Sequence, residues 1–234
     1  MFRALLWAAI LPSGILCKRI LNLDKVESEP AGLLWKVFLL GCLSCVPASI
    51  LEAAGESIIP EDLSPTAYSV AMFFVMVPLV EEGCKFFALN TVRNEPAFNY
   101  TFDGIVYGVM ASLGFATVEN ILYVFVSGSF GVAFTRAILS VPLHCVCGVF
   151  MGYYYGLAHR NGKLGHEETK VLYLLLSLLV PMLIHGIYDV CLSLDDPIVT
   201  LGGLIFTLVM FVLAVQRTRI SAAQDEAFWG GSEQ

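Results

Sequence analysis

Long apolar stretches alternate with short polar segments along almost the whole chain. Each apolar stretch is long enough to cross a hydrocarbon core of about 30 Å as a helix. The stretches cover approximately residues 4–21, 33–53, 66–90, 104–127, 132–157, 171–193 and 198–215. The pattern predicts an all-α protein, a polytopic membrane bundle of about seven transmembrane helices. We expect a single domain over residues 1–219, followed by a short polar tail over 220–234.

Composition supports this interpretation and excludes other classes. Hydrophobic residues make up 57% of the chain and charged residues 14%, against about 45–50% and about 25% in ordinary soluble domains. The net charge is −7 and no basic cluster is present, which argues against nucleic acid as a partner. The expected environment is a lipid bilayer. The seven cysteines form an odd set that lies mostly in apolar stretches, which is typical of small packing residues rather than of a disulfide framework.

Lysine and arginine are distributed unequally between the two sets of loops. The loops at 52–65, 128–131 and 194–197 contain none. The opposite set carries Lys18, Arg19, Lys25, Arg93, Arg160, Lys163, Lys170, Arg217 and Arg219, and only Arg3 departs from the bias. Because cytoplasmic loops are enriched in basic residues, we expect an amino terminus outside and a carboxyl terminus in the cytoplasm, in the cell membrane.

Several apolar stretches contain ionisable side chains far from their ends. A charge at the centre of a bilayer costs about 2.5–3.5 kcal/mol on insertion scales, so such groups usually mark functional sites. The third to sixth stretches carry Glu81, Glu82 and Lys85, then Glu119 and Asn120, then His144, then His185 and Asp189. At about 1.5 Å per residue, four of these stretches bring an ionisable group close to the midplane. The distribution predicts one buried polar site.

Helical spacing indicates what this site can do. Lys85 follows both glutamates by three or four residues, so it can neutralise one carboxylate and leave the other as a proton acceptor. His185 and Asp189 are four residues apart, and the aspartate can orient the imidazole. Two other charged residues have simpler interpretations. Arg136 is expected to extend its side chain to the membrane surface, with pairing to the site as the alternative, and Asp103 is expected to cap a helix.

The motifs resemble those of one known family. Glu81-Glu82-x-x-Lys85, Phe115-x-x-x-Glu119-Asn120, an isolated His144 and His185-x-x-x-Asp189, in this order on successive membrane helices, resemble the PrsW family. Its members are bacterial intramembrane proteases whose best-known task is the first cut of a membrane-spanning anti-sigma factor. The family is grouped with the CAAX prenyl proteases of the Abi superfamily. Those enzymes have histidine where Glu119 stands here, and the resemblance covers about residues 75–190.

The resemblance implies a peptidase that acts on a membrane protein substrate. The expected catalytic residues are Glu81, Glu82, Glu119, His144, His185 and Asp189, with Lys85 and Asn120 in support. Glu81 or Glu82 would activate a water molecule. In one version Glu119, His144 and His185 bind a divalent metal, most plausibly Zn²⁺. In a metal-free version Glu81 and Glu119 share the water, while His185 and Asn120 hold the oxyanion.

Other classes explain the sequence less well. The His-Glu-x-x-His motif, the Gly-x-Gly-Asp motif and the Gly-x-Ser-Gly motif of other membrane proteases are absent. The main alternative is an ion- or proton-coupled transporter that uses the same Glu, His and Asp side chains. A receptor or a peptide-binding protein of seven helices is a third interpretation.

Overall fold

The computed structural model describes residues 2–60 and 62–225, and in this part of the chain every regular element is a helix. Six helical segments are long and apolar enough to cross a membrane. They are α1 (Phe2–Leu21), α2 (Ala31–Glu56), α5 (Thr101–Ser127), the pair α6 (Phe130–Ile138) and α7 (Ser140–Lys163), α8 (Glu167–Ser193) and α9 (Pro197–Ala223). The prediction of a polytopic helical membrane protein is confirmed. The predicted tail begins inside α9, and residues 226–234 lie outside the described part.

The third predicted span is helical but divided. It consists of α3 (Pro65–Ser69), the π-helical turn η1 (Val70–Met76) and α4 (Val77–Asn90), so it is not one of the six long helices. Pro78 has no N–H to donate to the carbonyl of Phe74, which interrupts the regular hydrogen bonding where η1 passes into α4. Such π-helical turns often accompany functional sites. Here the turn immediately precedes the Glu81-Glu82 pair.

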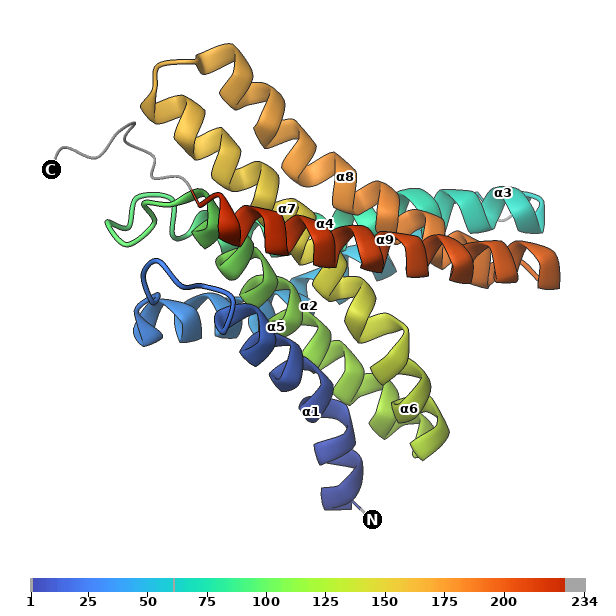
Figure 1. The fold of residues 1–234 in the computed structure, drawn as a ribbon. Coiled ribbons are helices and arrows are strands. Elements are labelled where there is room, and N and C mark those ends of the chain that lie inside the picture. The colour runs from blue at the N-terminus through green and yellow to red at the C-terminus, as the bar shows by residue number, and fades with distance from the viewer. Residues whose placement is uncertain (1, 61, 226–234) are drawn as a thin grey trace, which may run out of the picture.

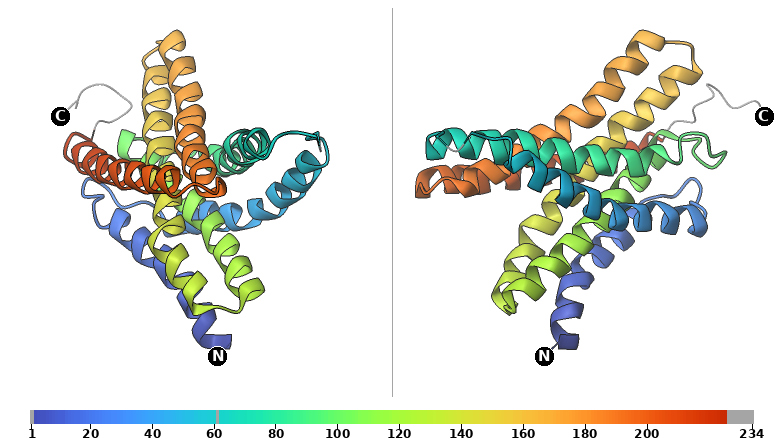
Figure 2. Two further views of the ribbon diagram at one scale, coloured as in Figure 1. Left: turned by 90° about the vertical axis from the view of Figure 1, so that its right-hand side faces the viewer. Right: turned by 180° about the vertical axis from the view of Figure 1, so that it is seen from behind.

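Helix α5 forms the centre of the bundle. Every residue from Phe102 to Thr117 is buried, because α1, α2, α4 and α7 pack around this helix. The helices cross near the middle of the molecule and diverge beyond it (Figures 1 and 2). One group, containing α1 and α6, separates from another that contains α3 and the first turns of α9. We call the space between these two groups the fork.

Glycines allow α5 and α7 to approach closely. Gly104 and Gly108 on α5 face Gly148 and Gly152 on α7, and a Cβ atom added to Gly108 would lie 2.6 Å from the carbonyl oxygen of Gly148. A Cβ atom on Gly152 would overlap the carbonyl oxygen of Gly104. Small residues permit such backbone contact between membrane helices. The close approach brings His144 on α7 against the motif-bearing face of α5.

Replacing Gly152 by Ala is therefore expected to destabilise the fold by about 1–3 kcal/mol, since overpacking forces backbone shifts. The measurement is thermal unfolding of the purified protein in detergent. Gly202→Ala in α9 is the matched control, because nothing lies within 4 Å of a Cβ atom added there. Equal melting temperatures for the two variants would show that α5 and α7 are not in backbone contact at Gly152.

Candidate active site

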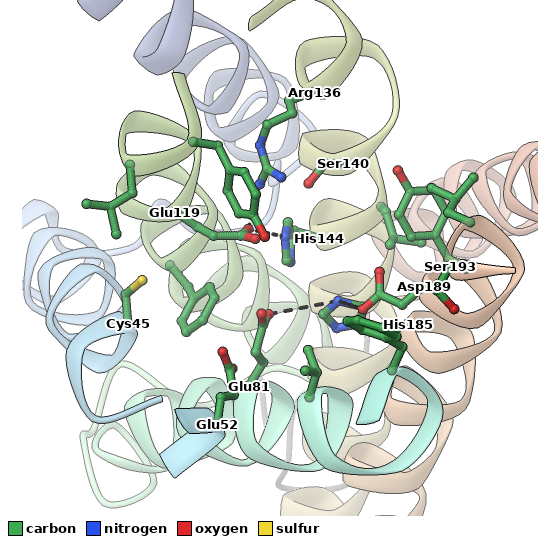
Figure 3. Close-up of a pocket in the computed structure, with 18 of the residues that line it drawn as sticks. Cys45, Glu52, Glu81, Glu119, Arg136, Ser140, His144, His185, Asp189 and Ser193 are labelled. Carbon is green, nitrogen blue, oxygen red and sulfur yellow. Dashed lines mark hydrogen bonds and ion pairs between the residues drawn. The ribbon is translucent and has the colours of Figure 1, made fainter. Parts of the chain in front are cut away.

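The fork contains a cavity of about 570 Å³. Side chains from α2, η1, α4, α5, α6, α7 and α8 line it (Figure 3). Five of the predicted catalytic residues are among them: Glu81, Glu119, His144, His185 and Asp189. The sixth, Glu82, lies behind the wall with Lys85, and both are completely buried. The structure thus brings residues from four separate predicted spans to one place.

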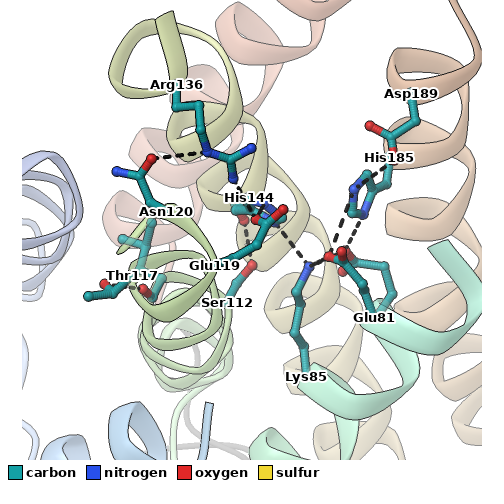
Figure 4. Close-up of polar contacts among 12 residues, drawn as sticks. Glu81, Lys85, Ser112, Thr117, Glu119, Asn120, Arg136, His144, His185 and Asp189 are labelled. Atoms are coloured by element: carbon teal, nitrogen blue, oxygen red, sulfur yellow. Dashed lines mark hydrogen bonds and ion pairs between the residues drawn. The ribbon is translucent and has the colours of Figure 1, made fainter. Parts of the chain in front are cut away.

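Lys85 joins the two glutamates to His144. Its ammonium nitrogen lies 2.9 Å from Glu81 Oε2, 2.8 Å from Glu82 Oε1 and 3.0 Å from His144 Nδ1 (Figure 4). It also lies 4.3 Å from the centre of the Phe115 ring, a favourable position for a cation. An ammonium group has three hydrogens and no acceptor. All three hydrogens therefore have a partner, and His144 Nδ1 must accept.

The acceptor role of Nδ1 determines the tautomer of His144. In the neutral imidazole the proton is then on Nε2, which lies 2.8 Å from Glu119 Oε2 and donates to it. Glu119 is also paired with Arg136, whose Nη2 lies 2.8 Å from the same oxygen. His144 thus connects the Lys85 cluster on α4 to Glu119 on α5. Its orientation is set from both sides.

Carboxylates flank both ring nitrogens of His185. Nδ1 lies 2.8 Å from Glu82 Oε1, and Nε2 lies 3.2 Å from Asp189 Oδ2. An ionised carboxylate only accepts hydrogen bonds, so this arrangement favours a ring with protons on both nitrogens. The expected spacing of His185 and Asp189 on one helix face is present. The rings of His185 and His144 lie close together, with their centres 5.2 Å apart.

Each of three site-bearing helices has a proline shortly before its ionisable residue. Pro78 precedes Glu81, Pro142 precedes His144, and Pro181 precedes His185. Pro142 cannot donate to the carbonyl of Ile138, and the single predicted span 132–157 is accordingly broken into α6 and α7 at Leu139. Such breaks change the direction in which the following turn presents its side chains.

Two residues lie differently from their predicted positions. Arg136 does not extend away from the bundle but pairs with the site, which was the alternative expectation. Its Nε donates to Asn120 Oδ1 at 3.0 Å, and its guanidinium contacts Glu119 and the ring of Tyr123. The amide nitrogen of Asn120 donates to the carbonyl of Ala9 at 2.7 Å. Both polar groups of Asn120 are thus engaged within the bundle, so Asn120 supports Arg136 and does not face an oxyanion. In the sequence, Asn120 and Arg136 are equally distant from Gly128, which lies at the turn between α5 and α6. Two helices joined by a tight turn bring such residues side by side, so this spacing could have predicted their contact.

Glu52 was not among the predicted site residues. It was placed in an acidic outer loop, but it belongs to the last turns of α2 and its side chain lines the cavity. Its Oε1 is buried and has no hydrogen-bond partner. Cys45, about two turns earlier on α2, also lines the cavity. All seven cysteines are free, which agrees with their predicted role in packing.

Comparison with known proteins decides between the remaining interpretations. A family model described as "PrsW family intramembrane metalloprotease" matches residues 29–216. Protease PrsW of Bacillus subtilis is 36% identical over 191 residues, which cover 81% of this chain and 83% of that protein. Protease PrsW of Halalkalibacterium halodurans is 34% identical over 226 residues, covering 95% of this chain and 99% of the relative. This chain belongs to the PrsW family of intramembrane metalloproteases. No solved structure matches the chain.

Membership in the PrsW family establishes a multi-pass membrane protease whose substrates are membrane proteins. The transporter interpretation is therefore not favoured. The buried side chains also fit the metal that the family description implies. Glu81, Glu82, His144 and His185 each offer a ligand atom, and these atoms lie within 4.8 Å of one another. Imidazole and carboxylate are common ligands of catalytic zinc. Glu119, which sequence analysis placed among the ligands, lies outside this group of four and contacts the other side of His144.

Proposed function

We propose that this PrsW-family protein hydrolyses a peptide bond of a single-span membrane protein, with Glu81 as the general base. One observation carries the choice of Glu81. Of the two adjacent glutamates, Glu81 lines the cavity, whereas the side chain of Glu82 is completely buried. A general base must come within hydrogen-bond distance of the water that it deprotonates. Of the two, Glu81 is therefore the one placed to contact water in the cavity.

The surrounding residues then have distinct tasks. The ammonium of Lys85 lies 2.9 Å from Glu81 Oε2 and supplies the counter-charge of the carboxylate that accepts a proton from water. Glu81 then transfers the same proton to the leaving amine, so that one carboxylate acts first as the general base and then as the general acid. Glu82 holds Lys85 and His185 in place through one oxygen. Arg136 and Glu119 close the far side of the cavity and fix the tautomer of His144.

The residues that would hold a divalent metal are His144, His185 and Glu82, which belong to the group of converging ligand atoms. Binding would replace the hydrogen bond from Lys85 to His144 Nδ1 and would require His185 to give up one ring proton. A zinc ion held by these residues would supply Lewis-acid polarisation of the scissile carbonyl and of a water molecule. Glu119 is then the carboxylate that orients the His144 imidazole, an arrangement common among metal-binding histidines. Lys85 would then release His144 Nδ1 and remain paired with Glu81 and Glu82.

The position of the cavity supports the orientation and the substrate class. Its lining includes Glu52, Tyr123 and Ser193, each close in sequence to a loop that lacks lysine and arginine. By the distribution of basic residues this is the outer side, with the amino terminus outside and the carboxyl terminus in the cytoplasm. We propose that the cut falls near the outer surface of the membrane. The resemblance described above implies a substrate of the anti-sigma-factor type.

Incubation of the purified protein with a tagged single-span reporter tests this proposal. We expect one cleavage product, mapped by mass spectrometry to the outer half of the span, and loss of cleavage with a chelator. His144→Ala should lose bound zinc and reduce cleavage by at least about 10²-fold. His166→Ala is the matched control, since this histidine is exposed and lies far from the cavity. An intact reporter in the presence of folded, zinc-loaded protein would refute the proposal.

A further inference from the structure

A second cluster of carboxylates lies outside the active site. It is formed by Asp24 and Glu29 in the segment between α1 and α2, and by Asp103 in the first turn of α5. One oxygen from each residue lies within 4.8 Å of the other two. In Figure 1 the segment is the dark-blue loop at the end of the molecule remote from α3 and α6. The cluster therefore lies at one end of the bundle and the cavity at the other.

Two oxygens of this cluster have no partner. Glu29 is only 7% exposed; its Oε2 accepts a hydrogen bond from the hydroxyl of Tyr107, but its Oε1 is buried and unpartnered. Oδ2 of Asp24 is likewise buried and unpartnered. Within residues 2–60 and 62–225, Asp24, Glu29 and Asp103 form no ion pair with lysine, arginine or histidine. Buried carboxylates without a counter-charge are costly, so the cluster requires a proton or a cation.

Electrostatics at the loop agree with this requirement. Burial, and then the neighbouring Asp225 carboxylate, raise the pKa of Asp24 to about 6. Burial also raises the pKa of Glu29. Three carboxylates that share one proton still carry negative charge, which a divalent cation would neutralise.

Asp103 gives the cluster a rigid base. It was expected to be the helix cap itself, but it stands at the third position of α5, where Oδ2 accepts from the backbone N–H groups of Asn99 and Tyr100 at 2.9 and 2.7 Å. Asp225, just beyond α9, accepts from the N–H of Phe102 at 3.0 Å. The start of α5 is thus joined to the end of α9, and the carboxylate of Asp103 is fixed before any ligand binds.

We infer that Asp24, Glu29 and Asp103 form a binding site for a hard divalent cation of the Mg²⁺ or Ca²⁺ class. The ligands are oxygen atoms only, which these two ions prefer, whereas the active site adds two imidazoles and suits zinc. The bound ion ties the loop between α1 and α2 to the first turn of α5. It therefore stabilises the end of the bundle remote from the cavity. This site is independent of the proposed catalytic mechanism.

The test uses the full chain with both active-site imidazoles removed by His144→Ala and His185→Ala, so that the remaining metal site is observed alone. Binding of Mn²⁺ is followed by electron paramagnetic resonance, and Mg²⁺ or Ca²⁺ is added as competitor. We expect one bound Mn²⁺ per chain, displaced by at least one of the two competitors. In that background Glu29→Gln, which keeps the size of the side chain, should weaken Mn²⁺ binding by about tenfold or more.

The matched control is Glu27→Gln on the same loop, because the exposed side chain of Glu27 accepts from the amide of Asn99 and is not one of the three converging carboxylates. Thermal unfolding with and without cation provides a second readout that does not depend on activity. The cation should raise the melting temperature of the Glu27→Gln protein and not that of the Glu29→Gln protein. Equal affinities for the two variants, or no Mn²⁺ binding before Glu29 is changed, would overturn the site and leave a shared proton as the explanation.

Discussion

Glu81→Gln is expected to lower the rate of reporter cleavage by about 10²–10⁴-fold, the contribution typical of a general base. Glutamine keeps the size of the side chain and an oxygen that can accept from Lys85, so the bundle should remain folded. It cannot take a proton from water. The measurement is single-turnover cleavage of the reporter in detergent or liposomes, together with the melting temperature of the variant.

Glu52→Gln is the matched control for this result. Both glutamates line the same cavity, but Glu52 comes from α2 and forms no contact with Lys85, His144 or His185 among the described residues. We expect cleavage by Glu52→Gln to remain within a few-fold of the unmodified protein. If Glu81→Gln cleaved as fast as Glu52→Gln, Glu81 would be excluded as the base.

The predicted helices follow from simple physics. A membrane-spanning segment must satisfy its backbone hydrogen bonds internally and expose apolar side chains to lipid, so its length and composition are visible in the sequence. The cost of burying charge made Glu81, His144 and His185 conspicuous for the same reason. Their convergence was predicted from depth alone. The structure adds the lateral positions, which depend on how α5 and α7 pack through Gly108 and Gly148.

Other features depend on how each helix is rotated about its own axis. In a helix surrounded by protein, the periodicity of apolar residues does not determine this rotation. Neighbouring residues point about 100° apart, and this separates Glu81 in the cavity from Glu82 behind its wall. The position of Asn120 likewise depends on Arg136, a residue in the next helix. Glu52 was missed because α2 continues to Glu56, beyond the apolar stretch, so a side chain assigned to a loop reaches the cavity instead.

The burial of Lys85 gives the largest expected effect on stability. Lys85→Met removes an ammonium that is 0% exposed and leaves two glutamates without their counter-charge. Breaking a buried ion pair by removal of one partner costs about 3–5 kcal/mol. We therefore expect a much lower melting temperature in detergent and little folded protein. Lys36→Met is the matched control, because the Lys36–Glu95 pair is 41% and 32% exposed at its side chains and exposed pairs contribute about 0–1 kcal/mol.

A second substitution separates charge from packing. Adding Glu82→Gln to Lys85→Met removes one of the two uncompensated carboxylates, so part of the lost stability should return. Cleavage should not return, because Glu81 would still lack its ammonium partner and His144 Nδ1 would lack its donor. If the double variant were no more stable than Lys85→Met, the loss would come from the missing side-chain contacts of Lys85, including the Phe115 ring, and not from unpaired charge. Full cleavage by either variant would exclude Lys85 from the control of the active-site charge.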